Sequence, residues 1–151
     1  ATSPLARELT DDQRSRLLRF FRRHRAQLLE PALKALREET RITSRRFLVD
    51  ALSAMGEGSI PKLVTRARSG PWYLTRNLAI VLGRLGDPAA LPFLTSLLDH
   101  DHHRVRRESL RSLARLDHQG RQTVAGYAAD KARDPVERRL ARYILKRSET
   151  P

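Results

Sequence analysis

Four arginines recur at an almost constant spacing along the chain. They are Arg46, Arg76, Arg107 and Arg138, and successive members lie 30, 31 and 31 residues apart. A guanidinium group is permanently charged and donates paired hydrogen bonds to carboxylates and phosphates. The spacing therefore predicts a strip of arginines, one in each repeated unit, that binds an anionic partner. In the alternative interpretation the same arginines cap backbone carbonyls and bridge neighbouring repeats.

Aromatic and polar residues beside this register extend the predicted strip. Trp72 and Tyr73 come directly after Gly70 and Pro71, where a helix is expected to begin, and their rings would form a stacking platform. The alternative is an aromatic plug that covers the seam between two repeats. The full set predicted to bind the partner is Arg46, Arg76, Arg107, Arg111, Arg138, Trp72, Tyr73 and Asn77.

Catalytic and metal chemistry has little support in the sequence. The chain has no cysteine, which excludes a disulfide framework, a thiol nucleophile and a cysteine-based zinc site. Histidines and aspartates do cluster in one stretch, namely Asp99, His100, Asp101, His102 and His103, with His118 further on. Adjacent histidines in a turn point in different directions, so we predict no metal site and no cofactor. Glycine-rich phosphate loops and nucleophile elbows are also absent, and we predict no catalytic residue.

Proline and apolar residues share the period of the arginines. Pro31, Pro61 and Pro92 each begin a Pro-x-Leu sequence, at offsets of 30 and 31 residues. An apolar position keeps the same register, at Leu52, Leu82, Leu113 and Ile144. Three residue types that share one period indicate stacked supersecondary units. No sustained alternation of apolar and polar residues predicts a strand.

Each unit is predicted to contain two helices, A and B. In the third unit, Asp87 and Pro88 are an N-cap and a first helical residue, and helix A is expected to reach about His100. Helix B, over about 104–116, has an apolar arc that includes Arg106 near its edge, so Arg106 should lie between neighbouring repeats. Arg107 and its equivalents should point outward. In the second unit helix B, over about 72–85, is apolar nearly all round and should be buried.

These residues resemble a bacterial HEAT repeat. The resemblance is clearest at residues 86–94 followed by 105–110, and at 72–77 followed by 82–86; it covers roughly 26–147. It implies an all-α fold, a right-handed α-solenoid (alpha-alpha superhelix) of about four HEAT-like helical hairpins with an N-terminal capping helix. The family's Val-Arg pair is complete only at Val105-Arg106, since the fourth repeat has Val136-Glu137.

The resemblance also implies a domain plan. We expect a disordered or loosely attached N-terminus over 1–10, a single HEAT-like repeat domain over 11–147, and a tail over 148–151. Within the domain we expect a capping helix over 11–25 and repeats over 26–56, 57–86, 87–117 and 118–147. The basic run of the capping helix is expected to be its solvated face, with a membrane surface as the alternative.

HEAT-like repeats serve as binding scaffolds, as accessory modules, as subunits of phycobilin lyases and as a class of DNA glycosylases. A glycosylase would need a carboxylate beside aromatic walls, but the residue one turn after Trp72 is Arg76. Nothing marks a chromophore site. We therefore expect no enzyme, but a non-catalytic protein-interaction scaffold that uses the concave B-helix face and is a module of a larger bacterial protein.

The net charge of +13 and a pI near 11.4 favour an anionic partner. We expect another protein with an acidic surface, with nucleic acid as the alternative partner. Of the 30 basic residues 26 are arginine, and codon bias in a GC-rich genome would produce the same excess. With no signal-peptide pattern and no apolar run long enough to span a membrane, a cytoplasmic location is expected.

Overall fold

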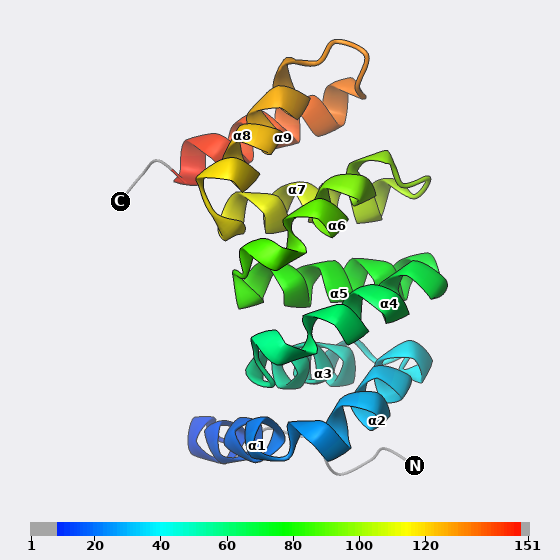
Figure 1. Ribbon diagram of the computed structural model, residues 1–151, viewed down its shortest axis with the longest axis vertical. Helices are drawn as coiled ribbons and strands as arrows, with labels where there is room; N and C mark the ends of the chain where they lie inside the picture. The colour runs from blue at the N-terminus through cyan, green and yellow to red at the C-terminus, as the bar shows by residue number, and fades with distance from the viewer. Residues whose placement is uncertain (1–8, 149–151) are drawn as a thin grey trace. The chain divides into compact units, whose positions relative to one another are not determined.

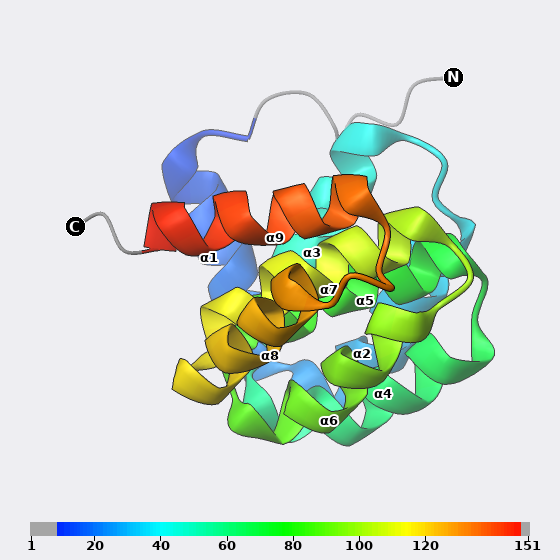
Figure 2. The same ribbon diagram turned by 90° about the horizontal axis from the view of Figure 1, so that it is seen from above.

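The computed structural model describes residues 9–148, and this part of the chain is helical with no strand (Figures 1 and 2). The expected loose N-terminus over 1–10 and the tail over 148–151 fall largely outside the described residues. The elements in chain order are α1 (Asp11–Arg23), α2 (Arg25–Glu38), α3 (Ile42–Ala54), η2 (Glu57–Ser59), α4 (Ile60–Ser69), α5 (Trp72–Leu85), η3 (Pro88–Ala90), α6 (Leu91–Ser96), η4 (Leu97–Asp99), α7 (His103–Leu116), α8 (His118–Ala129) and α9 (Pro135–Ser148).

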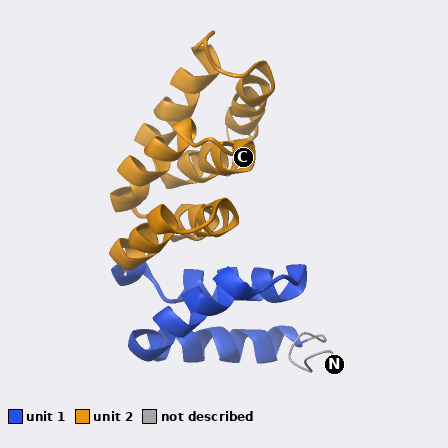
Figure 3. Cartoon of the chain, turned by 90° about the vertical axis from the view of Figure 1, so that its right-hand side faces the viewer, with its two compact units in different colours: residues 1–59 blue, residues 60–151 orange. Residues whose placement is uncertain are grey.

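The chain divides into two compact units, Ala1–Ser59 and Ile60–Pro151 (Figure 3). The first contains α1 to α3 and the short η2 turn, and the second contains α4 to α9. The single repeat domain over 11–147 and its four repeat boundaries stay predictions.

The first unit is a three-helix packing in which α1 and α2 both contact α3. The helix α1 begins at a capping box, because the Thr10 hydroxyl accepts from the Gln13 amide and the Gln13 side chain accepts from the Thr10 amide. Arg14 of α1 forms an ion pair with Asp50 of α3. None of the residues of α1 is buried. The core lies between α2 and α3 and contains Leu29, Leu33, Leu36, Val49, Leu52 and Met55.

The second unit stacks three helical hairpins. The helix α5 packs along α7, and α7 in turn contacts both α8 and α9. As predicted, α5 is buried over most of its length, because Leu74, Leu78, Val81 and Leu82 are all inaccessible or nearly so. It ends at Gly86, whose left-handed φ of +68° suits glycine.

A close contact between backbones joins the two central B helices. A Cβ added to Gly83 of α5 would lie 2.6 Å from Ser112 Cβ of α7. The Ser112 hydroxyl donates to the Ala79 carbonyl at 2.8 Å, so its polar group is satisfied inside the helix interface. A glycine and a serine thus allow α5 and α7 to approach more closely than larger side chains would.

The A helix of the third repeat differs from its predicted extent. The third repeat was expected to have one helix to about His100, but the structure has η3, α6 and η4 in succession, ending at Asp99. Pro92 has no amide hydrogen to donate to the Pro88 carbonyl, which favours the tight η3 turn before it. In the fourth repeat α8 ends at Ala129, and the Asp130 side chain accepts from the Ala132 amide at 2.9 Å. That aspartate starts the turn that leads into α9.

Candidate partner-binding face

The helix α7 separates a buried side from a basic side. Val105, Ser109, Leu110 and Leu113 are completely buried. The opposite side has Arg104, Arg111 and Arg115, all exposed, together with the half-buried Arg107. The apolar side and the basic side expected for this helix are therefore confirmed, although Arg107 is more buried than the other arginines of the basic side.

A buried carboxylate holds the third and fourth repeats together. Glu137 of α9 is only 1 % exposed, and it accepts hydrogen bonds from Arg106 of α7 and Tyr127 of α8. Arg106 Nη2 lies 2.9 Å from Glu137 Oε1, Arg106 Nε lies 3.0 Å from Oε2, and Tyr127 Oη lies 2.6 Å from Oε2. Burial and the hydrogen bond to Glu137 raise the pKa of Tyr127 to about 12. The predicted position of Arg106, between neighbouring repeats, is confirmed.

Arg106 also fixes the turn that precedes its own helix. Its Nη1 donates to the carbonyls of His100 at 2.8 Å and Asp101 at 2.9 Å. The hydrogen bond to Glu137 raises the pKa of the Arg106 guanidinium, which therefore stays charged. One arginine thus joins a turn, a helix and the next repeat.

Arg107 lies beside the same carboxylate but makes no hydrogen bond to it. Its Nε is 3.9 Å from Glu137 Oε1, and this buried nitrogen has no hydrogen-bond partner within the described chain. Both oxygens of Glu137 already accept from Arg106, and Oε2 also accepts from Tyr127. Two guanidinium groups therefore share one carboxylate, which leaves an excess of positive charge at Arg107. Its side chain is 36 % exposed and so can be reached from solvent.

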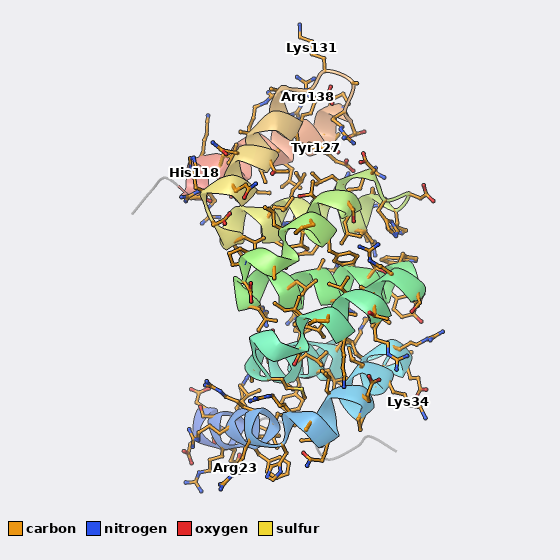
Figure 4. The ribbon with its side chains drawn as sticks, viewed as in Figure 1. Arg23, Lys34, His118, Tyr127, Lys131 and Arg138 are labelled. Carbon is orange, nitrogen blue, oxygen red and sulfur yellow. The ribbon has the colours of Figure 1, made fainter. Side chains whose placement is uncertain are left out.

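The other predicted strip arginines have different surroundings. Arg76 is half-buried, and its Nη1 lies 3.4 Å from the Asn77 side-chain oxygen. Arg138 Nε donates to the Ala128 carbonyl at 3.2 Å, so it turns toward its own A helix and caps it, as in the alternative interpretation (Figure 4). Arg111 is exposed and lies 3.5 Å from Glu108. Arg107 and its equivalents were expected to point outward; Arg46 is exposed, whereas Arg76, Arg107 and Arg138 are half-buried, and Arg138 turns toward α8.

Arg46 and Asn77 also belong to the predicted set. Arg46 is exposed on α3 and belongs to the first unit, so it is described there alone. Asn77 is buried, with only 5 % of its surface exposed. Its Nδ2 has no hydrogen-bond partner within the described chain. We call Arg76, Arg107 and Arg111, on the packed helices α5 and α7, the arginine face.

The predicted stacking platform is already occupied within the chain. Trp72 of α5 stacks on His102, at 3.7 Å between ring centroids and 5° between ring planes, while Tyr73 makes an edge contact with Trp72. Arg104 lies over the Trp72 ring at 5.8 Å. Because His102 belongs to the turn before α7, the stack covers the seam between the second and third repeats. This geometry favours the aromatic plug over an open platform.

The histidine cluster has a structural role in this turn. His100 Nδ1 accepts from the His102 amide at 3.0 Å, and His102 Nδ1 accepts from the Arg104 amide at 3.2 Å, which caps α7. Partial desolvation, followed by the positive charges of His103 and Arg104, lowers the pKa of His102. Within residues 9–148 no group of three histidine or acidic side chains is placed to hold a metal ion.

Sequence reasoning missed the partners of Arg106. Glu137 lies 31 residues after Arg106, in the same register position, so the departure from the Val-Arg pattern supplies the counter-charge. No register position or motif in the sequence indicated the roles of Tyr127 and Arg133. Arg133 lies over the Tyr127 ring at 4.9 Å and pairs with Asp99 of η4, which adds a second ion pair across this seam.

A family profile of HEAT repeats matches residues 60–146. The chain belongs to the HEAT-repeat family. The resemblance and the all-α solenoid class are thereby confirmed, while the bacterial source stays a prediction. None of the curated proteins compared with the chain matches it. HEAT repeats commonly serve as scaffolds for protein interactions, and no helix within residues 9–148 is long and apolar enough to cross a membrane.

Proposed function

We propose that this HEAT-repeat chain is a non-catalytic scaffold that binds an acidic segment of a partner protein on its arginine face. The supporting observation is Arg107, whose buried Nε lacks a hydrogen-bond partner beside a carboxylate that two other side chains already occupy. A carboxylate from the partner would approach the exposed part of the Arg107 side chain, because the Nε itself is buried. It would also neutralise the excess charge.

Partial burial makes Arg107 the strongest candidate on this face. Arg107 shares the Glu137 carboxylate with Arg106, so its positive charge is only partly compensated in the unbound chain, and an anionic ligand would complete the compensation. Arg111 is more exposed and already lies near Glu108, so we expect it to speed association more than it strengthens binding. Arg76 should contribute less than Arg107, because the Asn77 side chain already contacts it.

Nucleic acid is a second candidate, and the net charge of +13 favours it. Binding of single strands usually adds stacking of bases on exposed aromatic rings. In this chain His102 and Arg104 already lie against the Trp72 ring. The acidic protein segment is therefore the better-supported ligand.

The test compares Arg107→Gln with Arg121→Gln, a matched change of an exposed arginine on α8. The probes are a fluorescent glutamate-rich peptide and a DNA duplex, each titrated at several salt concentrations. We expect R107Q to weaken peptide binding about tenfold, since a hydrogen bond to a charged group contributes about 1.5–3 kcal/mol. R121Q should change it less than about twofold.

Equal losses for R107Q and R121Q would show that general charge, rather than the arginine face, binds the peptide. DNA that binds more tightly than the peptide at every salt concentration would replace the proposal with the nucleic-acid alternative. Thermal unfolding of R107Q checks the fold. Because the change removes a partly buried charge without a hydrogen-bond partner, we expect no loss of stability.

A further inference from the structure

The helix α9 has an exposed apolar ridge, which lies outside the arginine face. Val136 and Tyr143 of α9 are each 55 % exposed, although residues of this size are usually covered. They are seven residues apart, which places them on one side of the helix, about two turns from each other. Leu140, half-buried, lies between them on the same side.

Basic side chains lie along one flank of this ridge and at its C-terminal end. Arg139, Arg142 and Arg147 are all exposed on α9. Arg147 Nη1 donates to the Tyr143 hydroxyl at 2.9 Å, and its guanidinium lies over that ring at 5.7 Å, so charge and apolar surface adjoin each other. The one acidic residue of α9 is Glu137, which is buried and bonded to Arg106 and Tyr127. No carboxylate of α9 itself is therefore available to its surface arginines.

We propose that this ridge binds an amphipathic acidic helix of a partner protein. Apolar side chains at positions i, i+3 or i+4, and i+7 of that helix would cover Val136, Leu140 and Tyr143. Its flanking carboxylates would pair with Arg139 and Arg147, with the paired geometry that guanidinium groups favour. The site goes beyond the arginine face, since its residues lie on another helix and include an apolar anchor.

Charge decides between the occupants that an apolar ridge could have. A second copy of the chain would bring two strongly basic α9 surfaces together, and like charges across an interface oppose association. A partner with a basic or neutral helix would leave the arginines without counter-charges. An amphipathic acidic helix would both cover the apolar ridge and pair with the arginines beside it.

The experiment uses two fluorescent peptides of about 16 residues with one composition, rich in glutamate and leucine. In the first, the leucines form one helical stripe; in the second, the same residues are scrambled so that no stripe exists. We expect the striped peptide to bind the full chain about tenfold more tightly than the scrambled one, because only the stripe covers the ridge. The double variant V136S/Y143S should abolish this preference.

Ile42→Ser is the matched control, since Ile42 is an exposed apolar residue of the first unit, 62 % accessible. It should keep the preference for the striped peptide. The variant R107Q should also keep it, so that failure of the arginine face and failure of this site are distinguishable. Circular dichroism should show all the variants folded, because each altered apolar side chain is exposed.

Equal binding of the two peptides by the unaltered chain would overturn the proposal, as would a preference that survives V136S/Y143S. Light scattering and flotation with anionic phosphatidylserine vesicles test the remaining occupants. Self-association, or vesicle binding that V136S/Y143S abolishes without a preference for the striped peptide, would assign the ridge to a second copy or to a membrane surface instead.

Discussion

Glu137 and Arg106 occupy one register position in successive repeats and carry opposite charges. Had the fourth repeat kept the arginine of the family's Val-Arg pair, two guanidinium groups would meet in one partly buried seam. The substitution by glutamate instead lets a nearly inaccessible carboxylate accept from Arg106 and Tyr127. Its cost is the position of Arg107, which lies 3.9 Å from the same carboxylate without a hydrogen bond. The same substitution thus stabilises the seam and leaves the charge of Arg107 only partly compensated.

Replacing Glu137 with glutamine should destabilise the chain substantially. The buried side of Arg106 would lose its counter-charge, and removing one partner of a buried pair costs about 3–5 kcal/mol. Because Arg106 remains 23 % exposed, we expect roughly 3 kcal/mol, near the lower end of that range. Urea unfolding measures the loss. Tyr127→Phe, which removes only the 2.6 Å hydrogen bond, should cost less, about 1.5–2 kcal/mol.

Tyr143→Phe provides the control for these changes. Its hydroxyl contacts Arg147 on an exposed surface, and we expect an effect below about 0.5 kcal/mol. An E137Q chain with the unfolding free energy of the original would mean that the seam gains nothing from the ion pair.

His102 should make the stability of the chain depend on pH. Its pKa is lowered in the folded chain, whereas the unfolded histidine titrates near 6.5. Between these two pKa values the unfolded state binds more protons, so the free energy of unfolding falls as the pH drops through about 6.5 and below. Protonation would also remove the Nδ1 acceptor that caps α7. Urea unfolding at about pH 7.5 and about pH 5.5 measures the decrease.

The variant His102→Phe retains an aromatic ring against Trp72 but cannot titrate. It should be less stable at neutral pH, because it lacks the helix cap, yet show a smaller decrease with acid. His118→Gln, at an exposed histidine that begins α8, should retain the full decrease. If H102F responds to acid as strongly as the unaltered chain, another group is responsible.

At the scale of elements, the B helices were the most predictable part of the fold. The predicted spans for α5 and α7 agree with the structure to within one residue, because each has a long apolar arc, and α5 also begins directly after Gly70 and Pro71. The A helices were less predictable. Whether residues 88–99 form one helix or three short turns depends on small local energies around Pro92, which the apolar pattern does not specify.

Gly83 tests how closely the B helices must approach. Glycine in a helix interior costs about 0.8–1 kcal/mol relative to alanine, so Gly83→Ala would be stabilising if space allowed it. The added Cβ would instead lie 2.6 Å from Ser112 Cβ and 2.8 Å from its Cα, which forces α5 and α7 apart. We expect a net destabilisation of about 1–3 kcal/mol, measured by urea unfolding.

Gly126→Ala is the matched control, because an added Cβ there meets nothing within 4 Å on the exposed side of α8. It should stabilise the chain by about 0.5–1 kcal/mol through helix propensity alone. A stabilising G83A would contradict the close approach between α5 and α7.

At the scale of the whole molecule, the period of about 31 residues predicted the class of fold but not the binding site. Arg76, Arg107 and Arg138 share one register position, yet they contact an amide side chain, a shared carboxylate and a backbone carbonyl respectively. These contacts depend on Asn77, Glu137 and the end of α8, which do not repeat. The register therefore predicts the position of a residue on its helix, while neighbouring residues on the same and other helices determine which contacts its side chain makes.

The net charge of +13 should affect stability and binding in opposite directions as salt is added. Repulsion among the cations destabilises the compact state, and ions screen it as the Debye length falls from about 30 Å at 0.01 M to about 8 Å at 0.15 M. The partly buried pair between Arg106 and Glu137 is screened less. Raising NaCl over this range should therefore increase the melting temperature, by about 2–4 °C for a gain of roughly 1 kcal/mol. Affinity for the glutamate-rich peptide should fall over the same range. A melting temperature that falls with added salt, together with the affinity, would mean that internal ion pairs outweigh the repulsion. In that case the melting temperature of E137Q, which lacks the buried pair between Arg106 and Glu137, should rise with salt.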